Sequence, residues 1–217
     1  MPLYDLVVKT VKDGAGILED PADFDAAIAE ALNRYSKHRP RLVVDDVAGQ
    51  DGPDIALPEG WVNDFSNIDS IEFPIGNMPE TRIDRVDWRF YKTPTDTFIR
   101  FAAARPASVE EVRVTFTALH LEATLPPVDV EAVANLAASF CCGQLARHYG
   151  QTSDPTIQAD VVNYRSKGDE YARRAKELEA QYKNHVGIKE SDTTPAAMAV
   201  APAPDDSRVR LTHGRRR

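Results

Sequence analysis

The chain has 217 residues, of which 42% are hydrophobic and 28% are charged, and its formal net charge is −8. This length and apolar content predict one domain, or one domain with an appendage. The apolar runs are far shorter than the roughly 18 residues of a membrane span, so no transmembrane segment is expected. The first residues lack the basic segment and cleavage site of a secretory signal, so no such signal is expected.

The first 58 residues are expected to form two helices and a loop. Residues 3–11 place apolar side chains on one stripe but include several β-branched residues, so helix and strand compete, and we favour helix. A helix is expected over about residues 20–38, because Asp20 offers an N-cap and Pro21 suits the first helical position. Residues 43–58 are rich in Gly, Asp and Pro, which predicts a loop or a short extended piece.

A β insertion is expected over about residues 61–124. Alternation over residues 88–93 and 97–101, with turn-forming residues between them, predicts a hairpin. Strict alternation over residues 111–117 predicts a half-buried antiparallel strand, and residues 70–73 add another. Such a small sheet is stable only if it packs on something else, and we expect it to pack on the flanking helices.

Two long helices are expected in the carboxy-terminal half. Asp129 is the expected N-cap of a helix that runs to about Tyr149. This helix is apolar on most of its circumference, so it should lie at the centre of a bundle or be shared with a neighbouring subunit. A second helix, about residues 155–186, carries a 3.5-residue apolar seam. The seam consists of Ile157, Val161, Tyr164, Gly168, Tyr171, Ala175, Leu178 and Tyr182. Ion pairs at i, i+4 are expected for Asp169–Arg173, Glu170–Arg174 and Glu179–Lys183.

The chain over residues 187–217 is predicted to be an extended arm. It is rich in Ala and Pro and has no usable period, so it cannot bury enough surface to fold alone. It carries six Lys or Arg and four Asp or Glu residues, a net charge of +2, so residues 1–186 carry −10. An acidic body argues against general binding to duplex DNA. The expected fold class is α+β: a helical bundle with an inserted small antiparallel β region and an extended C-terminal arm.

The sequence contains no recognisable catalytic constellation. Neither a Gly-rich phosphate loop nor a nucleophile elbow occurs. Four Asp residues in one segment lack the pattern of a calcium loop and are expected to be solvated carboxylates: Asp45, Asp46, Asp51 and Asp54. His120 and Glu122 are expected on a wet surface, with a metal or acid–base pair as the alternative. Cys141 and Cys142 fit neither a zinc motif nor a disulfide framework, which predicts buried thiols in a reducing cytosol. We therefore expect no enzyme activity, cofactor or metal.

Three segments of the sequence resemble a known family. They are ALNRYSKHRP at residues 31–40, QLARHYG at residues 144–150, and YRSKGDEY at residues 164–171. Together with the order of the expected elements, they resemble the head–tail adaptor, or connector, proteins of long-tailed bacteriophages over about residues 20–186. The β insertion is larger here than in the smallest, purely helical members of that family.

The resemblance implies a structural virion protein of the phage neck. Such adaptors form a ring, typically of twelve copies, beneath the portal of a DNA-filled capsid, and they present a lower surface to the stopper or tail-completion ring. DNA would pass through the lumen without specific binding. The alternatives are another neck protein, such as a stopper or tail-completion protein, or a nucleic-acid-binding module that uses the basic C-terminus.

The resemblance also directs attention to two sets of residues. The central helix and the seam helix are expected to pack against neighbouring subunits through Phe140, Tyr164, Tyr171, Leu178 and Tyr182. Family members commonly send a carboxy-terminal arm into the portal assembly. Here that role would fall on Arg208, Val209, Arg210, Leu211, Arg215, Arg216 and Arg217. An arm of this kind loses entropy on docking but gains bidentate contacts between Arg and carboxylates.

Overall fold

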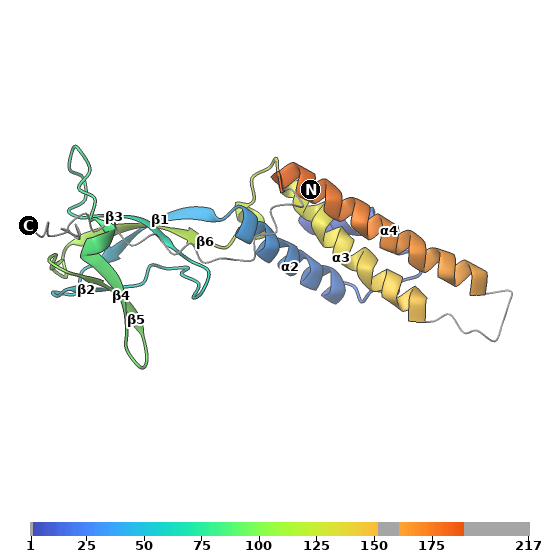
Figure 1. Cartoon of the computed structure of the whole chain (residues 1–217), viewed down its shortest axis with the longest axis horizontal. Coiled ribbons are helices and arrows are strands. Elements are labelled where there is room, and N and C mark those ends of the chain that lie inside the picture. Colours follow the sequence, from blue (N-terminus) through green and yellow to red (C-terminus); the bar gives the residue numbers. More distant parts are fainter. Residues whose placement is uncertain (1, 152–160, 189–217) are drawn as a thin grey trace, which may run out of the picture.

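The computed structural model describes residues 2–151 and 161–188, with side chains described from residue 167 onward in the second range. The fold is α+β, as predicted, and elongated, with the helices at one end and the strands at the other (Figure 1). The helices are α1 (Leu3–Val11), α2 (Ala22–His38), α3 (Val130–Gln151) and α4 (Val161–Val186). Within the described ranges, none of these helices combines the length and the apolar character needed to cross a membrane.

The first two helices are confirmed. In α1, Leu3, Val7 and Val11 are fully buried, so their spacing of four residues decides the competition between helix and strand. α2 begins at Ala22, two residues later than expected, and ends at His38, before the proline that forbids its continuation. Both helices bury one face against the rest of the bundle.

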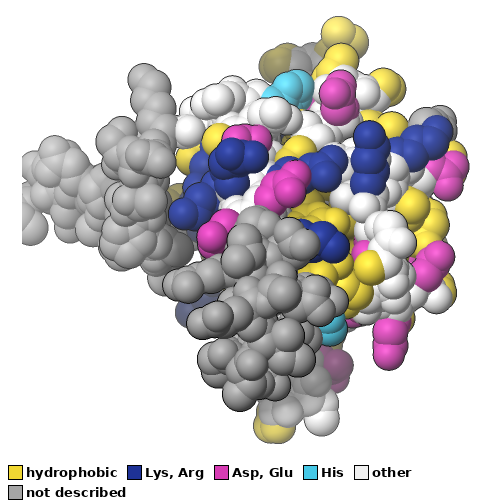
Figure 2. Space-filling model, turned by 90° about the vertical axis from the view of Figure 1, so that its right-hand side faces the viewer, with side chains coloured by type: hydrophobic (Ala, Val, Ile, Leu, Met, Phe, Trp, Pro, Cys, Tyr) yellow, Lys and Arg dark blue, Asp and Glu magenta, His cyan; other side chains and the backbone are white. Residues whose placement is uncertain are grey.

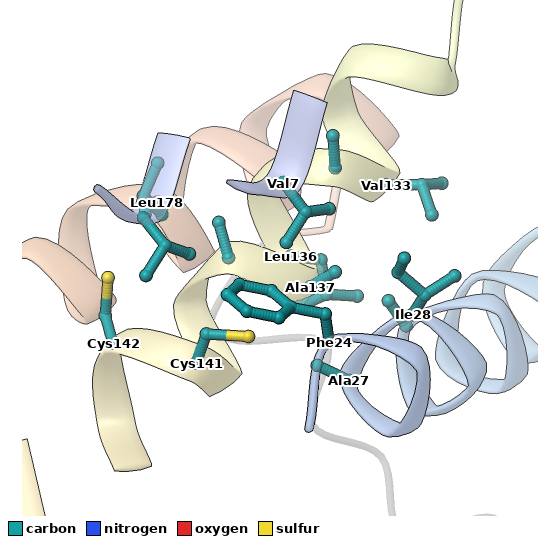
Figure 3. Packing of buried hydrophobic residues seen from close by; sticks show 14 of the residues in the cluster. Val7, Phe24, Ala27, Ile28, Val133, Leu136, Ala137, Cys141, Cys142 and Leu178 are labelled. Atoms are coloured by element: carbon teal, nitrogen blue, oxygen red, sulfur yellow. The ribbon is translucent and has the colours of Figure 1, made fainter. Parts of the chain in front are cut away.

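α3 is the central helix of the bundle, as its apolar circumference predicted. It packs on α1, α2 and α4, and Figure 3 shows Val7, Phe24 and Leu178 from these three helices pointing toward it. The thiols of Cys141 and Cys142 are free and buried, as predicted. Burial raises the pKa of Cys141 to about 12, so this thiol is inert at neutral pH. The core of the bundle therefore forms around α3, with buried residues from all four helices.

α4 confirms the seam as far as its side chains are described. Leu178 and Tyr182 are buried, and Tyr171 and Ala175 are partly buried against the same core, whereas the seam residues Ile157, Val161 and Tyr164 fall outside the described side chains. Gly168 lies against α3, where an added Cβ would meet Ala146 O at 3.4 Å. The seam therefore packs within the subunit.

Only one of the three expected ion pairs on α4 forms. Lys183 Nζ lies 2.9 Å from Glu179 Oε1. Arg173 instead reaches Glu177, with an N–O distance of 3.8 Å, and Arg174 donates to the backbone oxygens of Thr10 and Val11 on α1. The expected pairs of Asp169 with Arg173 and of Glu170 with Arg174 are therefore wrong. An exposed ion pair on a helix surface contributes little to stability, so it does not hold Arg174 away from the backbone acceptors of α1.

The β region consists of two three-stranded antiparallel sheets rather than one. Their strands are β1 (Arg41–Ala48), β2 (Asp54–Ala56), β3 (Ile68–Glu72), β4 (Trp88–Lys92), β5 (Thr97–Phe101) and β6 (Glu111–Ala118). The strand orders are β1-β6-β3 and β2-β5-β4. The predicted hairpin is β4–β5, and Val112, Val114 and Phe116 of β6 face inward and are fully buried, as predicted. One short 3-10 turn, Arg85–Asp87, precedes β4, and another, Glu122–Thr124, follows β6.

Of the two alternatives for residues 43–58, the extended piece is correct where the segment lies in β1 and β2, and a loop joins these two strands. β1 pairs with β6 along all eight of its residues. Its charged Asp46 fits there because Arg113 lies directly opposite and makes two hydrogen bonds of 2.8 Å to the carboxylate. The β region therefore begins at residue 41, not 61.

The four Asp residues expected to be solvated all accept hydrogen bonds. Asp46 pairs with Arg113, and Asp54 accepts from Arg100 of the adjacent strand at 2.6 and 2.7 Å. Asp45 accepts from the backbone N–H of Glu59 at 2.9 Å, and Asp51 from that of Ser108 at 2.8 Å. These hydrogen bonds hold the pKa of Asp46, Asp51 and Asp54 below its ordinary value. The carboxylates therefore link strands and loops.

The β region has a hydrophobic core of its own, so the expectation that the sheet packs on the flanking helices is wrong. Its buried residues include Ile55, Ile71, Ile99, Val114 and Phe116, which come from both sheets. The helical bundle buries a separate cluster around α3. The two sheets cover each other's apolar faces, which removes the need for a helix on either inner face.

Candidate assembly site

A buried carboxylate joins three helices where the bundle meets the β region. Asp129 precedes α3, and its side chain is only 4% exposed. Tyr35 donates to its Oδ2 at 2.5 Å, Arg39 Nη1 lies 3.1 Å from Oδ1 and 3.2 Å from Oδ2, and His185 Nε2 donates to Oδ1 at 2.6 Å. We call Tyr35, Arg39, Asp129 and His185 the Asp129 cluster. It ties the end of α2, the start of α3 and the end of α4 together.

The hydrogen bonds of the cluster fix the ionised form of Asp129. Burial alone would raise the pKa of this carboxyl, but the hydrogen bonds from Tyr35 and His185 and the charge of Arg39 outweigh burial and lower it. Burial and the neighbouring carboxylate raise the pKa of Tyr35 to about 12. A carboxylate that already accepts from three partners and has a lowered pKa is a weak base, so the cluster suits positioning rather than proton transfer.

Neighbouring polar residues extend the cluster. The expectation of a wet surface is wrong for His120, which is only 9% exposed; its backbone N–H donates to Ser36 Oγ at 2.8 Å and its ring lies edge-on to Tyr35, with centroids 5.0 Å apart. Glu122 accepts from the backbone N–H of Leu3 at 2.8 Å. His120 and Glu122 therefore have separate structural contacts and do not form a pair.

The sequence offered no direct signal for this cluster. Asp129 was expected only as an N-cap, and its carboxylate serves the other helices instead, although its backbone oxygen does accept from Val133 N at 3.0 Å. Its partners Arg39 and His185 are 90 and 56 residues away. Such contacts follow from how the helices pack, which no local pattern records.

The residues expected at subunit contacts are divided between the interior and the surface. Leu178 and Tyr182 are buried within the subunit. Phe140 and Tyr171 are partly buried and keep some exposed area: Arg34 covers the ring of Phe140 at 4.7 Å, and Tyr171 stacks on Tyr149 with centroids 5.7 Å apart. The side chain of Tyr164 falls outside the described residues.

The expected arm residues also fall outside the described part of the chain, which ends at Ile188. Its last residues lie at the Asp129 cluster, because Arg39 Nη2 approaches the backbone oxygens of His185 and Val186 at 3.4 and 3.5 Å. The described part of the chain therefore ends at the junction between the helical bundle and the β region.

Charge and metal-ligand chemistry give no further site. Figure 2 shows acidic and basic side chains intermixed over the end of the helical bundle. Among residues 2–151 and 161–188, no three His, Cys, Asp or Glu side chains group as metal ligands would. A scan against protein-family models finds no match, and a search of curated proteins finds no relative.

We predict that stability falls in two steps on acidification. Burial, and the positive charges of Arg34, Lys37 and Lys183, lower the pKa of His38, whose Nδ1 lies 2.7 Å from the hydroxyl of Tyr182. Because a lowered pKa favours the unprotonated folded form, the contribution of His38 is present above about pH 6.5 and is lost below it. The contribution of Asp129 is present above about pH 4 and is lost below it.

The first of these steps can be tested by thermal unfolding at pH 7.5 and pH 5. The wild-type chain should unfold at a lower temperature at pH 5, and His38→Gln should reduce that difference. An equal difference in both proteins would contradict the assignment to His38.

Proposed function

We propose that this chain is a structural subunit of a tailed-bacteriophage neck: a head–tail adaptor that forms a ring under the portal and links it to the stopper or tail, without catalysis. The observation that carries the proposal is an elongated subunit with two separate hydrophobic cores (Figure 1). A subunit of this form offers the helical bundle to one neighbouring ring and the β region to another. The resemblance of residues 31–40, 144–150 and 164–171 to adaptor proteins supports the same role.

The Asp129 cluster supports the proposal because it stiffens the connection between the two ends. A subunit that carries load between a capsid and a tail needs a junction that does not hinge freely. The cluster fixes the end of α2, which leads directly into β1, to α3 and α4. The acidic body, with a net charge of −10 over residues 1–186, is also suited to a channel through which DNA slides without binding.

The arm is proposed to bind the portal. The described chain ends beside the Asp129 cluster, and the sequence of residues 189–217 includes five arginines. Arginine forms bidentate contacts with carboxylates on a partner surface. In this proposal, twelve copies would surround the lumen, and each arm would reach up to the portal ring.

We predict that the full chain co-sediments with purified portal rings from the same phage and that its arm is required. Removal of residues 189–217 should abolish co-sedimentation while the circular dichroism spectrum keeps its helical signal. Replacement of Arg208, Arg210 and Arg215–Arg217 by alanine should weaken binding at least about tenfold, because each arginine loses its charged contacts. Failure of the full chain to bind any portal ring would contradict the adaptor function, and unchanged binding by the variants would contradict the role of the arm.

A further inference from the structure

Three strand edges of the β region have no backbone partner among the described residues: those of β1 and β4, and that of β2, which is only three residues long. β1 is an edge of its sheet and pairs only with β6, and β4 is an edge of the other sheet and pairs only with β5. The outer edge of β3, by contrast, is covered, because Ile83 N donates to Ile71 O at 2.8 Å and Phe73 N donates to Thr81 O at 2.9 Å. An open strand edge is a template for pairing with another chain.

The β1 edge is long, acidic and partly apolar. Leu42 and Val44 are 61% and 58% exposed on its outer face. An open groove of about 430 Å³ runs beside the strand and is lined mainly by aliphatic side chains, together with two acidic residues, Asp45 and Glu59, and one basic residue, Arg41. These two acids make no ion pair with a described residue. Residues 41–64 contain six acidic residues and one basic residue, a net charge of −5.

The β4 edge has the complementary character. Phe90 and Tyr91 are 40% and 37% exposed, although both lie on a strand. Arg89 and Lys92 are exposed beside them and make no ion pair with a described residue. Residues 82–105 contain six basic and three acidic residues, a net charge of +3. Both rings also have neighbours in the same copy: Phe90 lies against Trp61 and Trp88, with ring centroids 5.5 and 5.6 Å apart, and the guanidinium of Arg100 covers one face of Tyr91. The β4 edge is therefore a basic strip with partly exposed aromatic rings on a body that is acidic as a whole.

The two edges belong to different sheets and are not paired with each other within one copy. The ring of Phe90 on β4 lies 5.5 Å from that of Trp61, whose sequence neighbours Gly60 and Val62 line the groove beside β1. The β4–β5 hairpin projects away from the rest of the β region (Figure 1). Within one copy each of these edges lacks a partner strand, and a second copy can supply one.

We propose that β4 of one copy docks against the β1 edge of a second copy. The exposed edges of Phe90 or Tyr91 would lie against the groove, and Arg89 and Lys92 would face Asp45 and Glu59. Extension of a sheet by a strand from another chain supplies backbone hydrogen bonds, and the side-chain charges select the partner. The contact joins two different surfaces, so it repeats from copy to copy and closes into a ring when the rotation allows. This contact would join the subunits of the proposed ring, and its place in the phage neck rests on the proposed adaptor function.

Charge reversal tests this contact on the full chain. The Arg89→Glu/Lys92→Glu variant and the Asp45→Lys/Glu59→Lys variant should each weaken self-association at least about tenfold in sedimentation velocity, because both place like charges opposite each other. Mixing the two variants should restore pairs, because the reversed β4 edge of one meets the reversed β1 edge of the other. Arg173→Glu/Lys176→Glu is the matched control, since it makes the same charge change on an exposed face of α4.

The outcomes separate this inference from the proposed function. Two results would overturn the contact between strand edges: unchanged self-association of the β4 variant, or equally weakened self-association of the α4 control. A wild-type chain that stays monomeric both alone and on portal rings would also overturn it. Portal binding is measured in the same samples. If the chain binds portal but still assembles normally with reversed β4 charges, the adaptor function stands and the contact between strand edges is wrong. If the chain assembles through these edges but never binds portal, the contact stands and the adaptor function is wrong.

Discussion

Replacement of Asp129 by alanine is expected to lower the free energy of unfolding by about 3 kcal/mol. The change removes the acceptor shared by Tyr35, Arg39 and His185 and leaves their donors unpaired at a buried position. Loss of one partner from a buried, hydrogen-bonded charge cluster typically costs about 3–5 kcal/mol, and the lower end applies because Arg39 and His185 are partly exposed. Urea unfolding followed by circular dichroism at 222 nm measures the loss.

Two further variants show whether this effect belongs to the cluster. Asp129→Asn keeps the size of the side chain and one acceptor oxygen, so it should cost less than Asp129→Ala. Glu30→Ala removes an exposed partner of Arg34, with an N–O distance of 3.2 Å, and should change stability by no more than about 0.5 kcal/mol. If Asp129→Ala cost no more than Glu30→Ala, the Asp129 cluster would not hold the three helices together.

Local patterns in the sequence were sufficient to predict the helices. α1, α2, α3 and the described part of α4 all lie where apolar spacing and proline positions placed them. The burial of Cys141 and Cys142 also follows from the apolar circumference of α3. These predictions succeed because a helix closes its hydrogen bonds within the segment, so the signal that specifies it is local.

The β region was predicted less well because strands depend on distant partners. Residues 43–58 look like a loop or a short extended piece in sequence because they are rich in Gly, Asp and Pro, and β1 includes two of these Asp residues, Asp45 and Asp46. β1 becomes a strand because Arg113, 67 residues away, neutralises Asp46 across the sheet. The division into two sheets, and with it the separate hydrophobic core, depends on which strands pair, and alternation alone does not specify this. The same reason explains why the Asp129 cluster was missed.

The contacts between the two ends of the molecule are polar and local to the junction. The helical bundle buries its apolar residues around α3, and the sheets bury theirs against each other. What joins the ends is the short passage from α2 to β1, the return from β6 to α3, and the hydrogen bonds around Asp129 and His120. Since hydrophobic burial is the main source of folding cooperativity, the two ends should unfold as separate units.

Substitutions in the two cores are therefore expected to act on different spectroscopic signals. Both tryptophans of the chain, Trp61 and Trp88, pack against the core of the β region, so fluorescence reports that region, whereas circular dichroism at 222 nm reports mainly the helices. Phe116→Ala removes a fully buried ring whose centroid lies 5.9 Å from that of Trp61, and it should cost about 3–5 kcal/mol. The fluorescence midpoint in urea should then fall by about 1 M or more, while the midpoint at 222 nm changes little.

The reciprocal substitution completes the test. Leu145→Ala, at a fully buried position of α3, should cost about 2–5 kcal/mol and lower the midpoint at 222 nm without moving the fluorescence midpoint. Val109→Ala, at an exposed position of the β region, should move neither. Equal shifts of both signals in both core variants would mean that a loss of stability in one core destabilises the other core equally. In that case the helical bundle and the β region would be one cooperative unit, joined by the Asp129 cluster more strongly than its polar contacts suggest.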